Sequence, residues 1–407
     1  MSEHKNWDTS YEFRAITLLA VGFGLVGLDR FIINPLFPVI AEDLGLGYQD
    51  LGLISGVLAF TWGFAALFAG KITDRVGAKK VLIISVILFS ILVATSGLAT
   101  GLISLLVIRA LMGFAEGGFV PASIVATVQA AKPTRVGMAV GIQQMAAPFV
   151  GLGLGPLVAV GLLLLLPSWE WVFATVALPG FLVAYLMYRV LKDRPAEATV
   201  FATPTQGGYL DALKIRNILV AAIGITFFLS SLHPLGAFMP NYLVDYKGIA
   251  LEQMGVIMSG LGIGGVLGMI IIPAISDRIG MKITIACAML LTLLAALAIV
   301  ALNPGTLLMI VCLFSISAGA SGAVAITIGP FVSASVPPAI AATATGVVVG
   351  IGEMIGGAIA PALTGGLAEN VGIHVIPYVS LISATIGVLV VLIGMKEPQR
   401  LEHARPS

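Results

Sequence analysis

The chain has 407 residues, and its formal net charge is only +1 because 21 Lys and Arg nearly balance 20 Asp and Glu. Hydrophobic residues make up 58% and charged residues 10% of the sequence, with a mean hydropathy of +1.07. A soluble domain carries about 25% charged residues, so this composition excludes that class. Apolar runs of about 20 residues recur along the chain, which is typical of a polytopic membrane protein. The runs are continuous rather than alternating, which disfavours a β-barrel, and the near-zero charge gives no support to nucleic-acid binding.

The N-terminal "MSEHKNWDTSYEFR" lacks the apolar region of a cleavable signal peptide. Both cysteines, Cys287 and Cys312, fall in apolar segments, so the sequence implies no disulfide framework. The absence of N-x-S/T sequons, together with short loops, leads us to expect a multi-pass protein of the bacterial inner (cytoplasmic) membrane.

The apolar runs predict an all-α protein with twelve transmembrane helices. They fall near residues 14–40, 50–70, 79–100, 102–128, 136–162, 169–191, 215–243, 251–275, 282–302, 305–332, 339–367 and 372–395. The longest polar stretch, "KDRPAEATVFATPTQGGYLDALKIR", separates the sixth helix from the seventh. We therefore predict an N-terminal six-helix bundle at 1–191, a cytoplasmic linker at 192–214 and a C-terminal six-helix bundle at 215–407.

The placement of Lys and Arg predicts the orientation. All but Arg30, Arg109 and Lys247 fall in the termini, in loops after even-numbered helices or at the adjoining helix ends. Loops rich in these residues stay on the cytoplasmic side. Both termini are therefore expected in the cytoplasm.

The two halves are repeats. "GKITDRVGAKK" (70–80) follows the second predicted helix and "PAISDRIGMK" (273–282) follows the eighth, with Asp74 and Asp277 lying 203 residues apart. Two six-helix repeats in the same orientation predict pseudo-symmetric bundles with a substrate site between them near the membrane midplane. We expect gating contacts on the cytoplasmic side from Asp74, Arg75, Asp277 and Arg278.

"GKITDRVGAKK" resembles the loop 2–3 signature of the major facilitator superfamily, with Ala78 in place of the usual Arg. Within that superfamily, three segments resemble the anion:cation symporter family: "LDRFIINPLFPVIAEDLGL" in the first helix, "GLISGVLAFTWGF" in the second and "RALMGFAEGGFVPA" in the fourth. That family includes sugar-acid transporters, sialin and vesicular glutamate transporters. The resemblance implies the twelve-helix fold of the superfamily and proton-coupled transport of an organic anion.

The charged residues inside predicted spans are the candidate functional residues, because a charge at bilayer depth costs at least about 2.5 kcal/mol and normally faces a cavity or a partner. Arg30 is our candidate for anion binding, since its guanidinium stays charged and matches a carboxylate bidentately. The alternative is a salt bridge that holds the first helix to the fourth or fifth. Arg109 and Glu116 lie seven residues apart on one helix, about 10 Å along its axis, so they cannot pair closely with each other.

Asp29 and Glu116 are the candidate proton carriers. Burial disfavours the charged form of a carboxyl group and a nearby Arg favours it, so opening the site to water on one side shifts this balance. The resemblance assigns proton coupling to the same two positions. Arg109 would then tune the two carboxylates. The structural alternative for Asp29 is a permanent pair with Arg109.

Two titratable residues in the second half are further candidates. His233 lies 203 residues after Arg30, so the repeat places it at comparable depth, where it would bond substrate, take part in proton transfer or serve a structural role. Glu353 would either face the cavity and take part in proton coupling or bond, neutral, across a helix interface. Weaker candidates for substrate hydroxyls are Gln143, Gln144, Asn34, Asn241 and Tyr242.

Glycine-rich stretches predict close helix packing. "GLGLGP" in the fifth helix and "GIGEMIGG" in the eleventh form small-residue faces. The former partly resembles an antiporter motif of the superfamily, but Ala159 and Val160 stand where its last two glycines belong. "GIGGVLG" (262–268) lies inside a membrane span and is not a nucleotide site.

The sequence contains no catalytic set, metal-ligand cluster or P-loop. We therefore expect no enzymatic activity, no cofactor and no ATP drive. The favoured hypothesis is a secondary active transporter that imports a small organic anion, such as a sugar acid or carboxylate, with protons by alternating access. The expected partners are the anion, protons and membrane lipid, and we expect the protein to act as a monomer. The alternatives are a proton-coupled drug or metabolite efflux antiporter and a non-transporting sensor on the same fold.

Overall fold

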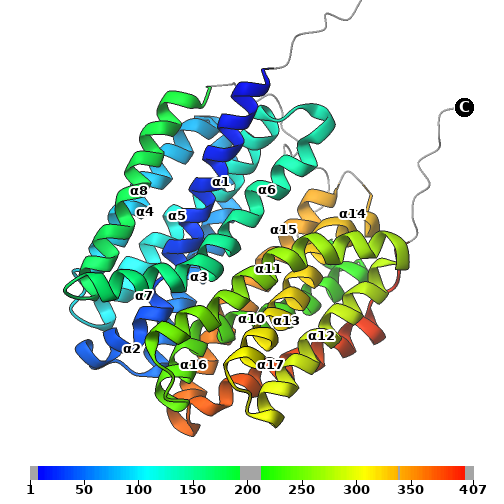
Figure 1. Ribbon diagram of the computed structural model, residues 1–407. Helices are drawn as coiled ribbons and strands as arrows, with labels where there is room; N and C mark the ends of the chain where they lie inside the picture. Colours follow the sequence, from blue (N-terminus) through cyan, green and yellow to red (C-terminus); the bar gives the residue numbers. More distant parts are fainter. Residues whose placement is uncertain (1–7, 193–211, 338–339, 399–407) are drawn as a thin grey trace, which may run out of the picture. The chain divides into compact units, whose positions relative to one another are not determined.

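The computed structural model describes residues 8–192, 212–337 and 340–398, and within these ranges the chain is almost entirely helical (Figure 1). Most of the predicted linker, 192–214, lies outside the described residues.

The first half of the chain forms the six predicted spans, two of them built from more than one helix. The helices are α1 (Thr9–Phe31), α2 (Ile33–Leu44), α3 (Tyr48–Val76), α4 (Ala78–Ser96), α5 (Leu102–Ala130), α6 (Val136–Pro148), η2 (Phe149–Leu154), α7 (Gly155–Leu165) and α8 (Trp169–Val190), with a short turn, η1 (Pro133–Arg135), before α6.

The second half forms the other six spans. Its helices are α10 (Arg216–Asn241), η3 (Tyr242–Tyr246), α11 (Leu251–Ile279), α12 (Met281–Leu302), α13 (Thr306–Ile326), η4 (Thr327–Phe331), α14 (Val332–Ser335), α15 (Ala341–Gly352), η6 (Glu353–Ile359), α16 (Ala360–Val371), η7 (Ile373–Val375), α17 (Ile376–Leu389) and η8 (Val390–Gly394). Within the described residues, 11 helical stretches are long and apolar enough to cross a membrane, and α3, with 29 residues, is the remaining predicted span.

The repeated loop motif has the same backbone in both halves. Gly77, between α3 and α4, has a φ of 93°, and Gly280, between α11 and α12, has a φ of 94°. A residue with a side chain rarely adopts such positive φ values, so a glycine at this point of each motif lets one helix end and the next begin within one residue. The internal repeat inferred from the sequence is thus present in the local structure.

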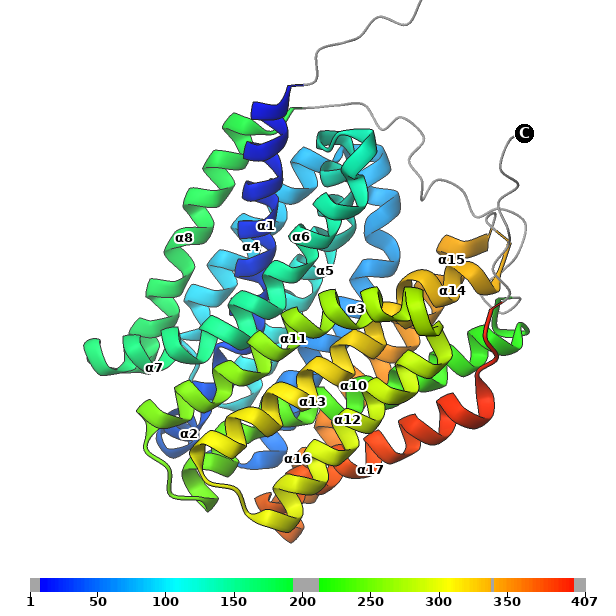
Figure 2. The same cartoon turned by 45° about the vertical axis from the view of Figure 1, so that its right-hand side comes forward.

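Contacts group the chain into two compact units. Unit 1 comprises Met1–Leu46 and Phe60–Val200, and unit 2 comprises Gly47–Ala59 and Phe201–Ser407, so α3 continues from one unit into the other. In unit 1, α1 packs against α5, α6 and α8. In unit 2, α11 packs along α13 and α10 along α17 (Figure 2). Gly264 and Gly268 of "GIGGVLG" lie directly against main-chain carbonyls of α13, so this stretch serves helix packing.

The first span is not the continuous helix that the sequence predicts. α1 ends at Phe31, a turn falls at Ile32, and α2 begins at Ile33. Pro35 lacks an N–H to donate to the carbonyl of Phe31, and its ring crowds that carbonyl, which explains a break at this point. Asp29 and Arg30 therefore lie in the last turn of α1, just before the break.

Two of the glycine-rich stretches contain wider, π-helical turns that the sequence did not predict. These segments are η2 in the fifth span and η6 in the eleventh, which begin at Phe149 and Glu353, 204 residues apart. A π-helical turn inserts one residue into an α-helix and often marks a functional region. Both repeats place this irregularity at nearly the same position.

The close packing of α1 against η2 depends on glycine. A methyl group at Gly151 would collide with the main-chain carbonyl of Gly27 and would lie 2.9 Å from the Phe31 ring. We expect Gly151→Ala to lower the free energy of unfolding by about 1–3 kcal/mol, the usual cost of overpacking. The check is thermal unfolding in detergent. Gly161→Ala is the matched control, because no atom lies within 4 Å of its added methyl group. Equal melting temperatures for the two variants would contradict this packing.

Candidate functional site in two helix bundles

Four charged residues of α1 and α5 form the candidate site in unit 1, which we call the charged cluster: Asp29, Arg30, Arg109 and Glu116. Asp29, Arg109 and Glu116 are 2%, 1% and 0% exposed, and Arg30 is half-buried. The charges of Arg30 and Arg109 both act on Glu116, and that of Arg109 acts on Asp29. The packing of α1 against α5 thus brings the sequence-predicted residues of the first and fourth spans together.

Arg109 binds the main chain of α1 and not the Asp29 carboxylate. Its Nη1 donates a hydrogen bond of 3.0 Å to the main-chain carbonyl of Asp29, while its Nε and Nη2 have no hydrogen-bond acceptor among the described residues. The Oδ1 of Asp29 likewise accepts no hydrogen bond there. The carboxylate–guanidinium pair considered as an alternative for Asp29 is not formed in this structure. Arg109 instead fixes α1 to α5 and supplies positive charge nearby.

Glu116 is the most enclosed carboxyl group of the cluster. Neither of its carboxyl oxygens has a hydrogen-bond donor within the described residues. A buried carboxylate without hydrogen bonds is costly, and the positive charges of Arg30 and Arg109 oppose the effect of burial on Glu116 without being the largest influence on it. The charge of Glu116 therefore depends on its surroundings, which is the property a proton carrier needs.

Arg30 lies against two aromatic rings. Its guanidinium carbon is 5.5 Å from the ring centroid of Phe31 and 5.5 Å from that of Trp62 on α3. Gly117 of α5 permits α3 to come this close, since a methyl group there would lie 2.5 Å from the Trp62 carbonyl oxygen. Both distances from Arg30 to a ring centroid are within the range at which a cation is attracted to the face of an aromatic ring. Sequence reasoning missed Trp62, although a tryptophan within "GLISGVLAFTWGF" was a visible signal.

Gln143 is enclosed and engaged by neighbouring side chains. It is 0% exposed, its Nε2 donates to Ser123 Oγ at 3.1 Å, and its Oε1 accepts from Gln144 Nε2 at 2.7 Å. The first of these bonds joins α6 to α5, so Gln143 contributes to helix packing, and its predicted substrate contact stays a prediction. Asn34 is buried in α2, four residues after Arg30.

In unit 2, His233 and Glu353 converge on one glycine. A methyl group at Gly357 would lie 2.7 Å from Glu353 Oε2 and 3.2 Å from His233 Nδ1. His233 lies in α10 and Glu353 begins η6, and both are half-buried. The structure therefore brings together two residues that the sequence had treated separately.

The remaining predicted substrate residues of unit 2 lie at the far end of α10. Asn241 Nδ2 donates to Asp245 Oδ2 at 3.0 Å, and the Tyr242 ring lies 5.3 Å from that of Tyr246. Lys247 Nζ lies 5.9 Å from the Tyr242 ring centroid. These residues form a separate polar and aromatic group, more than two helical turns beyond His233.

The predicted gating residues lie at helix ends. Arg75 is exposed in the last turn of α3, and Asp277 and Arg278 are exposed in the last turns of α11. The Asp74 side chain lies outside the described part of the structure. The gating role of all four residues stays a prediction.

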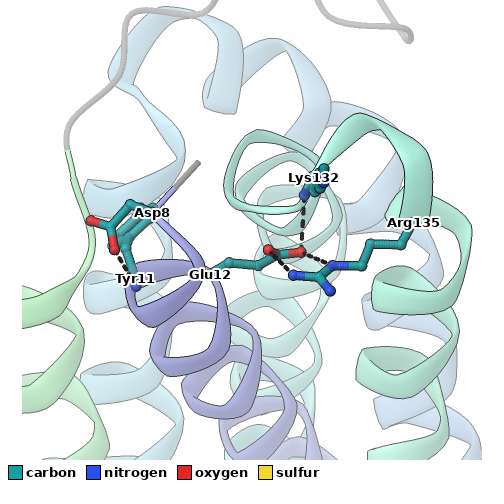
Figure 3. Close-up of polar contacts among 5 residues, drawn as sticks. All are labelled: Asp8, Tyr11, Glu12, Lys132 and Arg135. Atoms are coloured by element: carbon teal, nitrogen blue, oxygen red, sulfur yellow. Dashed lines mark hydrogen bonds and ion pairs between the residues drawn. The ribbon is translucent and has the colours of Figure 1, made fainter. Parts of the chain in front are cut away.

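An ion pair fastens the start of α1 (Figure 3). The Glu12 carboxylate, in a side chain only 4% exposed, accepts from Arg135 Nε at 2.8 Å and Nη2 at 2.6 Å, and from the Lys132 main-chain N–H at 2.9 Å. One turn earlier, Asp8 caps α1 by accepting from the Tyr11 N–H at 2.9 Å, and this hydrogen bond lowers the pKa of the Asp8 carboxyl. The bidentate pairing of Glu12 with Arg135 is strong and geometrically specific. It holds α1 against the loop between α5 and α6.

Comparison with known proteins defines the class of protein. The sequence matches the Major Facilitator Superfamily over residues 19–353. The fold is similar to that of a bacterial homologue of the human lysosomal transporter Spinster, with a TM-score of 0.74, 18% sequence identity, and coverage of 97% of this chain and 96% of that one.

Three relatives are similar in sequence. The hexuronate transporter of Bacillus subtilis is 28% identical over 268 residues, which span 63% of this chain and 62% of that protein. A quinolone resistance transporter of Acinetobacter baumannii is 26% identical over 78% of this chain and 80% of its own length. A putative tartrate transporter of Agrobacterium vitis is 24% identical over 96% of this chain and 92% of its own length.

The chain belongs to the major facilitator superfamily. It is a multi-pass, all-α membrane transport protein with two six-helix repeats, and not an enzyme. The superfamily assignment inferred from "GKITDRVGAKK" is thereby confirmed, as is the similarity to organic-anion transporters of that superfamily.

Proposed function

We propose that this protein imports a small organic anion, a sugar acid or another carboxylate, together with protons. The observation that carries the proposal is the charged cluster: a half-buried guanidinium with its central carbon 5.5 Å from each of two aromatic ring centroids, beside two buried carboxyl groups with oxygens that accept no hydrogen bond from the described residues. The printed names of the hexuronate and tartrate relatives support the substrate class.

Arg30 would bind the substrate carboxylate. Its charge is permanent, its guanidinium carbon lies 5.5 Å from the ring centroids of Phe31 and Trp62, and it lies beside the break between α1 and α2. Phe31 and Trp62 would line the same place and pack against the apolar part of an acid. Arg109, which bonds the main chain, would position α1 rather than contact substrate.

Glu116 and Asp29 would carry the protons. With the site open to the outside, both would be protonated and the anion would meet Arg30 beside two neutral carboxyl groups. With the site open to the cytoplasm, loss of these protons would restore negative charge beside Arg30 and help to expel the anion. Coulomb interactions over a few ångströms amount to several kcal/mol at partly buried sites, enough to change affinity by orders of magnitude.

Transport would proceed by alternating access of the two repeats in the bacterial inner membrane, with both termini in the cytoplasm. The clustering of Lys and Arg in alternate loops supports that orientation.

Drug efflux by proton antiport is the second candidate, and the quinolone resistance relative supports it. Against it stands Arg30, because a permanent cation in the site repels cationic drugs. The two functions differ in the direction of net movement under the same proton gradient.

Uptake into proteoliposomes tests the proposal. We expect one labelled sugar acid or small carboxylate to accumulate under an inward proton gradient and merely to equilibrate without it. Efflux of a preloaded cationic dye against the gradient, with no acid accumulated, would replace import by antiport.

A further inference from the structure

Glu353 and His233 lie against the same face of Gly357. The distances from a methyl group at that position, 2.7 Å to Glu353 Oε2 and 3.2 Å to His233 Nδ1, place the two side-chain atoms within about 6 Å of each other. An interaction over this range is strong enough for the charge of each group to influence the other. The absence of a side chain at Gly357 is what leaves room for both groups.

The helix packing that creates this contact is tight. Gly356, next to Gly357, lies against α10, where an added methyl group would be 2.5 Å from the Thr226 carbonyl oxygen and 2.9 Å from Leu229 Cβ. Nearby hydroxyl groups bond main-chain carbonyls: Ser230 Oγ donates to Thr226 O at 2.7 Å, and Ser231 Oγ donates to Phe228 O at 2.7 Å. The π-helical turn η6 therefore carries Glu353 to α10 through rigid, glycine-mediated packing.

The other ionisable groups of the surrounding elements lie elsewhere. In the described parts of α10 and of the elements packed against α10 or η6, the remaining charged residues fall in terminal turns or in η3: Arg216, Asp245, Glu252, Asp277, Arg278, Glu369 and, in the first and last turns of α3, Asp50 and Arg75. The remaining titratable residues of these elements are Tyr48, Tyr242, Tyr246, Cys312 and Tyr378. Glu353 is thus the carboxyl group placed beside His233 in this part of unit 2.

We propose that His233 and Glu353 form a coupled protonation site in unit 2, separate from the charged cluster of unit 1. The ligand is the proton. Without it the pair is a neutral imidazole beside a carboxylate; when one proton binds, the pair becomes either an imidazolium–carboxylate ion pair or two neutral groups. The internal repeat relates His233 to Arg30 of the charged cluster. His233 lies 203 residues after Arg30, so the first repeat carries a permanent cation where the second carries a cation that a proton creates.

Nitrogen-15 NMR of histidine in nanodiscs tests the proposal without any transport. The chain has 4 histidines, so the signal that disappears in His233→Gln identifies this residue. We expect Glu353→Gln to move the midpoint of the His233 titration by about one pH unit or more, because it removes the neighbouring charge. Glu252→Gln, which removes an exposed carboxylate from the first turn of α11, is the matched control and is expected to leave the midpoint unchanged.

A second pair of variants protects the test against misfolding of Glu353→Gln. Gly357→Ala inserts a methyl group between the two side chains and is expected to move the same midpoint, whereas Gly366→Ala, with no atom within 4 Å of its added methyl group, is not. An unchanged His233 midpoint in both Glu353→Gln and Gly357→Ala would overturn the proposal.

The physiological role of the His233–Glu353 pair rests on the proposed proton-coupled function. The electrostatic interaction between the two side chains does not depend on that function. A shifted midpoint in a protein that shows no proton-driven uptake would retain the coupled pair and reject the proposed function. Proton-driven uptake with an unchanged His233 midpoint would retain the proposed function and reject the coupled pair.

Discussion

Arg30→Ala is expected to weaken binding of the transported acid by at least about thirtyfold. The substitution removes the bidentate hydrogen-bond donor and leaves the substrate carboxylate unpaired in a partly buried place, a loss of about 2 kcal/mol or more. Isothermal titration of the purified protein with the acid measures this loss directly. Arg30→Lys keeps the charge but not the planar guanidinium, and its affinity for the acid is expected to lie between those of wild type and Arg30→Ala.

Arg189→Ala is the matched control for this experiment. Arg189 also lies beside an aromatic ring, with its guanidinium carbon 5.9 Å from the Tyr185 ring centroid, but it is exposed at the end of α8. We expect its removal to leave affinity unchanged. Equal affinities for wild type and Arg30→Ala, in a variant that unfolds at the wild-type temperature, would exclude Arg30 as the anion site.

Glu116→Gln is expected to abolish proton-driven accumulation while it preserves exchange of the acid across the membrane. Glutamine keeps the size of the side chain but cannot gain or lose a proton. A gradient of one pH unit sustains about tenfold accumulation for each proton carried, since one unit is worth about 1.4 kcal/mol. In the variant we expect the internal and external concentrations to become equal, measured with labelled acid at a clamped membrane potential.

Exchange of internal labelled acid for external unlabelled acid is the internal control of the Glu116→Gln experiment, because exchange needs the binding site but no net proton movement. Glu252→Gln removes an exposed carboxylate and is expected to accumulate the acid as wild type does. Retained tenfold accumulation in Glu116→Gln would assign the coupling to another group.

The sequence predicted the spans well for a simple physical reason. An apolar run of bilayer length has few alternatives to a membrane helix, and all twelve predicted segments correspond to helical segments in the structure. The irregularities within spans were harder to predict. The break at Ile32 depends on the local effect of Pro35. The π-helical turns η2 and η6 depend on packing against neighbouring helices, and the composition of a sequence segment does not contain that information.

The candidate site was predictable in its residue types and less so in its contacts. A charge inside an apolar run is conspicuous, so Asp29, Arg30 and Glu116 were identified from sequence. The acceptor for Arg109 is a main-chain carbonyl, and main-chain groups leave no trace in a charge pattern. The hydrogen bond from Gln143 to Ser123 was equally unpredictable, because it joins side chains of two different spans. The substrate contact of Gln143 stays a prediction.

Entry of protons with the acid tests the central claim most directly. Proteoliposomes containing a pH-sensitive dye would receive the acid identified by the uptake screen, without an imposed proton gradient and with the membrane potential clamped. The account predicts that the lumen acidifies as the acid enters, and that protein-free vesicles and Arg30→Ala vesicles show only the passive leak. Uptake of the acid with no change of internal pH, or with an alkaline change, would contradict proton symport.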